Sequence, residues 1–150
     1  MSETVEAPRI DWPSAAPEAM KALMALEKAI AAKVDRKLFH LIKLRASQMN
    51  GCAYCIAMHV KEALADGEPI QRLTLLDAWH ESHLYDERER AALEWTEAVT
   101  HIADGHAPRE IYDRLAASFS PEEVANLTLA ATAINAWNRV AIAGRSRHMD

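Results

Sequence analysis

Glycine, proline and cysteine are scarce in this sequence, whose 150 residues include four glycines, six prolines and two cysteines. No apolar run approaches the roughly 20 residues that a membrane-spanning helix needs. Acidic and basic residues are interspersed and the net charge is −5, so the basic stripe that tracks a phosphate backbone is missing. These absences argue against a membrane protein and against a nucleic-acid-binding protein.

The first residues, MSETVEAPRIDWPSAAP, also lack the charged start, apolar core and small-residue cleavage site of a secretory signal. We therefore expect a soluble cytoplasmic protein. In that reducing compartment, two cysteines at close spacing are more often catalytic or metal-binding than a structural cross-link.

What the sequence does contain favours helix throughout. Alanine is abundant, and β-branched residues never alternate with polar ones as they do in strands. A length of 150 residues fits one domain. We predict an all-α protein, with an irregular lead-in over residues 1–16 and a single compact domain of about six to seven helices over residues 17–150.

Start and stop signals divide this domain. Asp86 with Glu89, and Ser120 with Glu123, have the capping-box spacing, in which two side chains satisfy free N–H groups at a helix start. Proline suits the first turn of a helix, and glycine suits the position after the last turn. Together the signals predict helices over about 17–34, from 35 to a break at 50–51, over 52–66, from 86 to about 99, over 108–119 and from 121 onward, with a short apolar stretch at 70–79.

Both cysteines lie in the segment NGCAYCIAMH, residues 50–59. On a helix, Cys52, Cys55 and His59 share one face. Cys52 lies where the helix begins, and the free N–H groups and dipole of a helix start favour a thiolate over a thiol. His59 follows Cys55 by four residues, and a thiol beside a base is the signature of an activated nucleophile. The geometry fits a two-cysteine redox cycle.

Other interpretations of these residues have different requirements. A c-type haem site needs histidine directly after the second cysteine, where the sequence has Ile56. A zinc site needs a fourth ligand, for which His80 and His83 are candidates, but structural zinc sites usually draw ligands from two knuckles rather than one helix face. Each cysteine alone would suit an apolar core. Their spacing at a helix start, with His59, favours redox chemistry, and we expect neither a metal nor another cofactor.

The strings LIKLRASQMNGCAYCIAMHVKEAL (41–64), LLDAWHESHLYDERERAALEWTEAVT (75–100) and INAWNRVAI (134–142) resemble the alkylhydroperoxidase D-like proteins of the carboxymuconolactone decarboxylase superfamily. The resemblance implies an all-helical domain that assembles as a homo-oligomer, a trimer or hexamer. It also implies an antioxidant peroxidase that reduces organic hydroperoxides with thiols. A general disulfide oxidoreductase, or an oligomeric decarboxylase-like protein with a vestigial thiol site, is the alternative.

The resemblance also implies roles for the three residues. Cys55 attacks the peroxide and becomes a sulfenic acid, Cys52 condenses with it to a disulfide, and an external dithiol, of thioredoxin or lipoyl type, reduces that disulfide. His59 belongs to the proton relay that activates the attacking thiol. The helix start by itself favours Cys52 as the thiolate, whereas the base favours Cys55, and we follow the base because it agrees with the family.

Two positions depart from the family pattern. His40 stands twelve residues before the first cysteine, where better-known members carry glutamate, and Tyr54 stands where they carry histidine. Imidazole can carry a proton near neutral pH, so we expect His40 to serve as a catalytic proton carrier. Tyr54 is expected to line the substrate pocket. Polar residues on the apolar last helix, Asn135, Asn138 and Arg139, need partners, which predicts an inter-helix or inter-subunit network.

Overall fold

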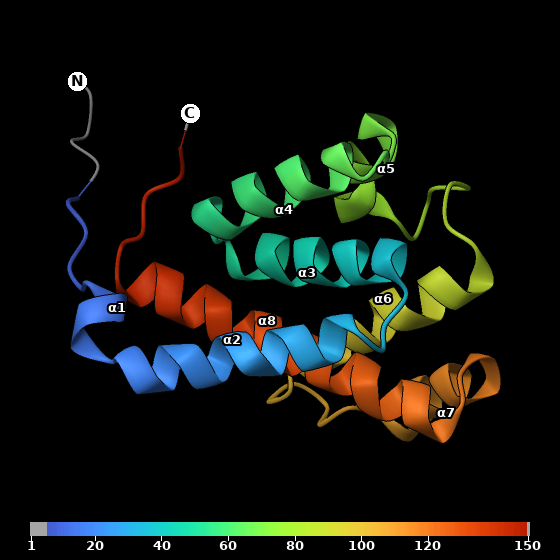
Figure 1. The fold of residues 1–150 in the computed structure, drawn as a ribbon. Coiled ribbons are helices and arrows are strands. Elements are labelled where there is room, and N and C mark those ends of the chain that lie inside the picture. The colour runs from blue at the N-terminus through green and yellow to red at the C-terminus, as the bar shows by residue number, and fades with distance from the viewer. Residues whose placement is uncertain (1–5, 150) are drawn as a thin grey trace.

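A computed structural model describes residues 6–149, and it confirms the all-α prediction. The described residues form one compact helical domain without strands (Figure 1). Its elements are α1 (Trp12–Ala15), α2 (Pro17–Ala31), α3 (Arg36–Asn50), α4 (Ala53–Ala65), α5 (Ile70–Thr74), the 3-10 helix η1 (Leu76–Ala78), α6 (Glu87–Thr100), α7 (Arg109–Ser118) and α8 (Pro121–Ala143).

Three of the predicted helix starts have the side-chain caps that the sequence indicates. The Asp35 carboxylate accepts a hydrogen bond from the Leu38 amide at 3.0 Å, which caps α3. Complete capping boxes form at Asp86 for α6 and at Ser120 for α8. Short polar side chains at these starts therefore fixed the division of the chain into helices.

The lead-in is more ordered than its sequence indicates, because residues 12–15 form a turn of helix. Pro13 favours the first turn, and the Trp12 indole N–H donates to the Val140 carbonyl at 3.2 Å. Gly144 permits this approach, since a Cβ there would collide with the Trp12 indole nitrogen. Figure 1 shows this N-terminal segment beside the C-terminal end of α8. A hydrogen bond between residues 128 positions apart in sequence thus stabilises this turn of helix.

Helix α3 forms the centre of the domain and packs against α4, α6 and α8. Its buried side chains face two apolar clusters. One joins α3 to α2, α6, α7 and α8, and the other joins it to α4, α5, η1 and α6. Leu41, Ile42 and Leu44 are fully buried. Burial on nearly all sides makes α3 a rigid support for the elements attached to it.

Four polar side chains form the predicted inter-helix network between α3 and α8. The side-chain amide of Asn50 donates to Asn135 Oδ1 and to Asn138 Oδ1, both at 2.9 Å. The Asn138 amide donates to Ser47 Oγ at 3.0 Å, and Ser47 donates to the Lys43 carbonyl at 2.7 Å. The network links helices within one chain, so it does not need a second subunit.

No helix within residues 6–149 combines the length and apolar character required to cross a bilayer. Assembly as a trimer or hexamer stays a prediction.

Asn138→Ala should destabilise the protein by about 2–3 kcal/mol, because it leaves the Asn50 amide and Ser47 hydroxyl short of partners in a buried site. Urea unfolding followed by circular dichroism measures the effect. Asn126→Ala, which removes a solvent-exposed hydrogen bond at a half-buried position of the same helix, is the matched control and should change stability by less than about 0.5 kcal/mol. Equal midpoints for the two variants would contradict the structural role of the network.

Candidate active site

The turn between α3 and α4 determines where the cysteines lie. Gly51 ends α3 with φ 66°, in the left-handed region that glycine adopts without a steric penalty. The Gly51 and Cys52 amides donate back to the carbonyls of Gln48 and Ser47. Cys52 is therefore the N-cap of α4, and its Sγ accepts a hydrogen bond from the Cys55 amide at 3.3 Å.

Cys52 and Cys55 are joined by a disulfide, with their Cα atoms 5.3 Å apart. Both residues are almost fully buried, at 1% and 2% exposure, and they contact the C-terminal half of α8 at Ala141. The spacing of one helical turn thus brings the two sulfur atoms into bonding distance without a further loop.

A cavity of about 550 Å³ opens beside the disulfide, between α1, α2, α3, α4 and α8. Cys55 lines it, whereas Cys52 does not. Tyr54 and His59 also line it, as do the charged residues Glu27, Lys43 and Glu62. The remaining wall is mostly apolar: Trp12, Pro13, Met20, Met24, Met58, Trp137, Val140 and Ala141. Cys55 and His59 thus share an apolar chamber with a small charged group.

The two ring nitrogens of His59 differ in their surroundings. Nδ1 lies 3.1 Å from Glu62 Oε2, while Nε2 is buried and has no hydrogen-bond partner. The hydrogen bond from His59 lowers the pKa of the Glu62 carboxyl below its ordinary value, and the charge of Lys43 adds to this effect. Lys43 Nζ lies 3.7 Å from Glu62 and 3.6 Å from Glu27.

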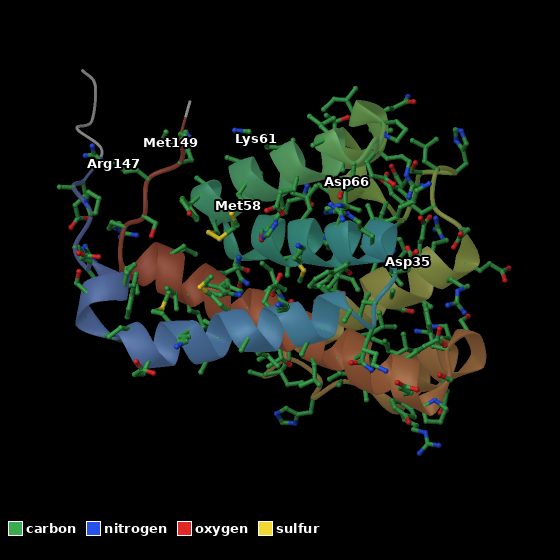
Figure 2. All side chains as sticks on the ribbon, viewed as in Figure 1. Asp35, Met58, Lys61, Asp66, Arg147 and Met149 are labelled. Carbon is green, nitrogen blue, oxygen red and sulfur yellow. A yellow bond between two sulfur atoms is a disulfide. The ribbon has the colours of Figure 1, made fainter. Side chains whose placement is uncertain are left out.

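His40 belongs to a different group of side chains. Its Nε2 lies 2.5 Å from Asp66 Oδ2, and Arg36 holds the same carboxylate. The bond from Arg36, followed by that from His40, lowers the pKa of Asp66. Asp66 follows the C-terminal end of α4, well away from Met58 of the cavity wall (Figure 2). His40 itself is not among the residues that line the cavity with Cys55.

The histidines considered as further zinc ligands also lie elsewhere. His80 stacks on Trp79 and lies 3.4 Å from Glu97, and His83 borders a second cavity. Neither lines the cavity beside Cys55. Within residues 6–149, no cluster of three histidine, cysteine or acidic side chains has the arrangement of a metal site.

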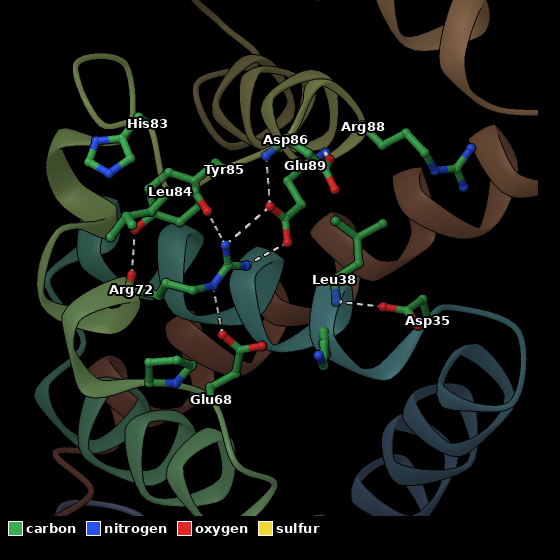
Figure 3. Close-up of a pocket in the computed structure, with 12 residues that line it drawn as sticks. Asp35, Leu38, Glu68, Arg72, His83, Leu84, Tyr85, Asp86, Arg88 and Glu89 are labelled. Atoms are coloured by element: carbon green, nitrogen blue, oxygen red, sulfur yellow. Dashed lines mark hydrogen bonds and ion pairs between the residues drawn. The ribbon is translucent and has the colours of Figure 1, made fainter.

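The second cavity, of about 750 Å³, is lined by an ion-pair network centred on Arg72 (Figure 3). The Arg72 guanidinium donates to Glu68 at 2.9 Å, to Glu89 at 2.5 Å and to the Leu84 carbonyl. The Tyr85 hydroxyl donates to the Arg72 carbonyl. Because all three guanidinium nitrogens are engaged, this network ties α5 to α6 rather than presenting free donors to a ligand.

Comparisons with known proteins identify the family. The family model for the carboxymuconolactone decarboxylase family matches residues 17–98, more than half of the chain. The chain belongs to that family. Its structure has a TM-score of 0.93 with ATU0492 of Agrobacterium tumefaciens, a protein of unknown function proposed to be the antioxidant defence protein AhpD, at 48% identity over 96% of this chain and 99% of the other. It is an AhpD-like member of the superfamily.

Two further proteins resemble this chain. Protein YdfG of Bacillus subtilis is 41% identical over 140 residues, which are 93% of this chain and 95% of that protein. The debrominase Bmp8 has a TM-score of 0.76 at 25% identity, over 89% of this chain and 72% of the other. Members of this family therefore include enzymes of different activity.

Sequence reasoning did not find the charged group beside His59. Glu62 could have been noticed, because a residue three positions after His59 lies on the same helical face. Glu27 and Lys43 come from other helices, and only the packing of α2, α3 and α4 brings them together.

After reduction, we expect iodoacetamide to alkylate Cys55 faster than Cys52, because only Cys55 lines the cavity. Peptide mapping by mass spectrometry at short reaction times measures the order. Cys52→Ser and Cys55→Ser variants, each with one thiol, provide matched single-site rates. Faster labelling of Cys52 would show that the cavity is not the route to the thiols.

Proposed function

We propose that this protein is a thiol-dependent peroxidase that reduces organic hydroperoxides through the Cys52–Cys55 pair. One observation carries the proposal: Cys55, bonded to Cys52, lines the same cavity as His59, whose buried Nε2 has no hydrogen-bond partner. The family and the similarity to an AhpD candidate support the same activity.

In the first step, His59 accepts the Cys55 proton and the thiolate attacks the terminal oxygen of the hydroperoxide. The O–O bond breaks as the S–O bond forms, which leaves Cys55 as a sulfenic acid. The proton on His59 passes to the departing alkoxide, and the product is an alcohol. Sulfur is oxidised by two electrons and the peroxide is reduced by two.

In the second step, the Cys52 thiolate attacks the sulfenic sulfur. The S–O bond breaks, the oxygen leaves as water after protonation, and the disulfide forms. The N-cap position suits this role, because the Cys55 amide donates to Cys52 Sγ and a helix N-terminus stabilises negative charge. An external dithiol then reduces the disulfide by thiol exchange and is itself oxidised.

The apolar lining of the cavity favours a hydroperoxide with a large organic group. Trp12, Trp137 and three methionines offer contact to an alkyl or aryl group, so a bulky hydroperoxide gains binding energy that hydrogen peroxide cannot. The cavity leads to Cys55 and thereby orients the peroxide toward the attacking sulfur.

Cys55→Ser should lower the dithiol-dependent reduction of cumene hydroperoxide by roughly three orders of magnitude or more, because the covalent nucleophile is lost. Consumption of hydroperoxide, followed with dihydrolipoamide as reductant, measures the rate. His83→Gln is the control, since His83 is exposed and lies outside this cavity, and it should leave the rate unchanged. Full activity in Cys55→Ser would refute the peroxidase proposal.

Cys52→Ser separates the two steps. It should consume about one equivalent of hydroperoxide per chain and stop at a Cys55 sulfenic acid, which has no neighbouring thiol to condense with. Dimedone labelling followed by mass spectrometry detects this species. An adduct at Cys52 in the Cys55→Ser variant instead would reverse the assigned roles.

A general disulfide oxidoreductase would use the same pair without a peroxide. Reduction of insulin by the reduced protein distinguishes this activity. We expect the cavity to exclude a polypeptide disulfide, so disulfide formation on adding stoichiometric cumene hydroperoxide should be faster than on adding insulin. The reverse order would favour the oxidoreductase.

A further inference from the structure

We propose that Glu62 is a positioning residue for His59: its carboxylate holds the imidazole with Nδ1 protonated, so that Nε2 exchanges the proton of Cys55. This inference rests on the proposed function and deepens it, because it assigns the group behind the base. The expected carrier, His40, lies in a separate pair with Asp66.

The contact with Glu62 determines which nitrogen of His59 carries the proton. A carboxylate only accepts hydrogen bonds, so His59 Nδ1, 3.1 Å from Glu62 Oε2, must be the donor. In neutral imidazole the other nitrogen is then an acceptor. That nitrogen, Nε2, is the buried atom without a partner, on a side chain that is 5% exposed and lines the cavity with Cys55. An acceptor left unpaired in a buried site is available for the thiol proton.

The charged side chains beside His59 do not balance one another. Lys43 lies between Glu62 and Glu27, at 3.7 and 3.6 Å, so two carboxylates surround one ammonium. This leaves one negative charge unbalanced beside His59. An imidazolium at His59 balances it, which favours transfer of the Cys55 proton to the ring. Glu27 Oε2 is buried and has no hydrogen-bond partner, so no donor offsets the charge on that oxygen.

The remaining ionisable groups near this site do not replace Glu62. His40 contributes charge near Glu62, but its Nε2 is engaged by Asp66 and it does not line the cavity. Tyr54 lines the cavity but is exposed, and no hydrogen bond joins it to His59 within residues 6–149. Among the described residues, the Glu62 carboxylate is the hydrogen-bond partner of the His59 ring.

The test uses Cys55 as the reporter in a Cys52→Ser background, where a single thiol remains. Glu62→Gln keeps the size of the side chain and removes its charge. We expect alkylation of Cys55 by iodoacetamide to slow about tenfold at neutral pH, the factor that corresponds to one charge-assisted hydrogen bond. The pH profile should move to higher pH, because the imidazolium that accompanies the thiolate loses its counter-charge.

Glu81→Gln, at an exposed position outside the cavity, is the matched control and should leave the profile unchanged. Nitrogen-15 NMR of wild type should show His59 protonated at Nδ1, and Glu62→Gln should populate both neutral tautomers. An unchanged profile and tautomer in Glu62→Gln would overturn the proposal, as would a His40→Gln variant that slows alkylation as much.

Neither readout needs hydroperoxide turnover, so the two proposals can fail separately. If Glu62→Gln shifts the alkylation profile but wild type does not react with cumene hydroperoxide, the peroxidase function fails and the role of Glu62 stands. If wild type reacts but Glu62→Gln behaves as wild type in alkylation, tautomer and turnover, the role of Glu62 fails and the peroxidase function stands.

Discussion

The geometry at the cysteines depends on one backbone constraint, the left-handed turn at Gly51. This turn lets α4 begin with only two residues between it and the end of α3, without a longer loop. Cys52 is thereby fixed at a helix start, and Cys55 follows one turn later against α8. A larger residue at position 51 would find space for its Cβ but would have to adopt a strained backbone conformation. The conformational freedom of glycine, rather than any contact it makes, sets the site.

The turn is held in place by polar contacts in an otherwise apolar core. Asn50, the last residue of α3, donates to two asparagines of α8, and Asn138 reaches back to Ser47. Directional bonds of this kind fix the register of two helices more narrowly than apolar packing does. The same two helices carry Lys43 and Ala141, which line the cavity. The α3–α8 interface therefore sets both the register of the two helices and the geometry of the cavity.

Capping residues and first-turn prolines made most helix starts predictable, because each signal and its helix are neighbours in sequence. The cysteine pair and His59 were visible for the same reason, since all three lie on one helical face. The docking of Trp12 on Val140 and the meeting of Glu27 with Lys43 were not visible, because they join distant segments. His40 illustrates the limit best. It stands at the position where better-known family members carry glutamate, but the Asp66 carboxylate that engages its ring lies 26 residues away in sequence.

The three methionines of the cavity wall have a chemical consequence of their own. Met20, Met24 and Met58 are the thioethers nearest to any oxidant that enters beside Cys55. Oxidation to sulfoxide would make this apolar wall polar, which under the proposed peroxidase function weakens its contact with the alkyl group of a hydroperoxide; methionine sulfoxide reductases would reverse the change. Peroxide that does not react with the thiols would thus oxidise these methionines. The cavity would lose its preference for apolar substrates gradually, before the disulfide chemistry stopped.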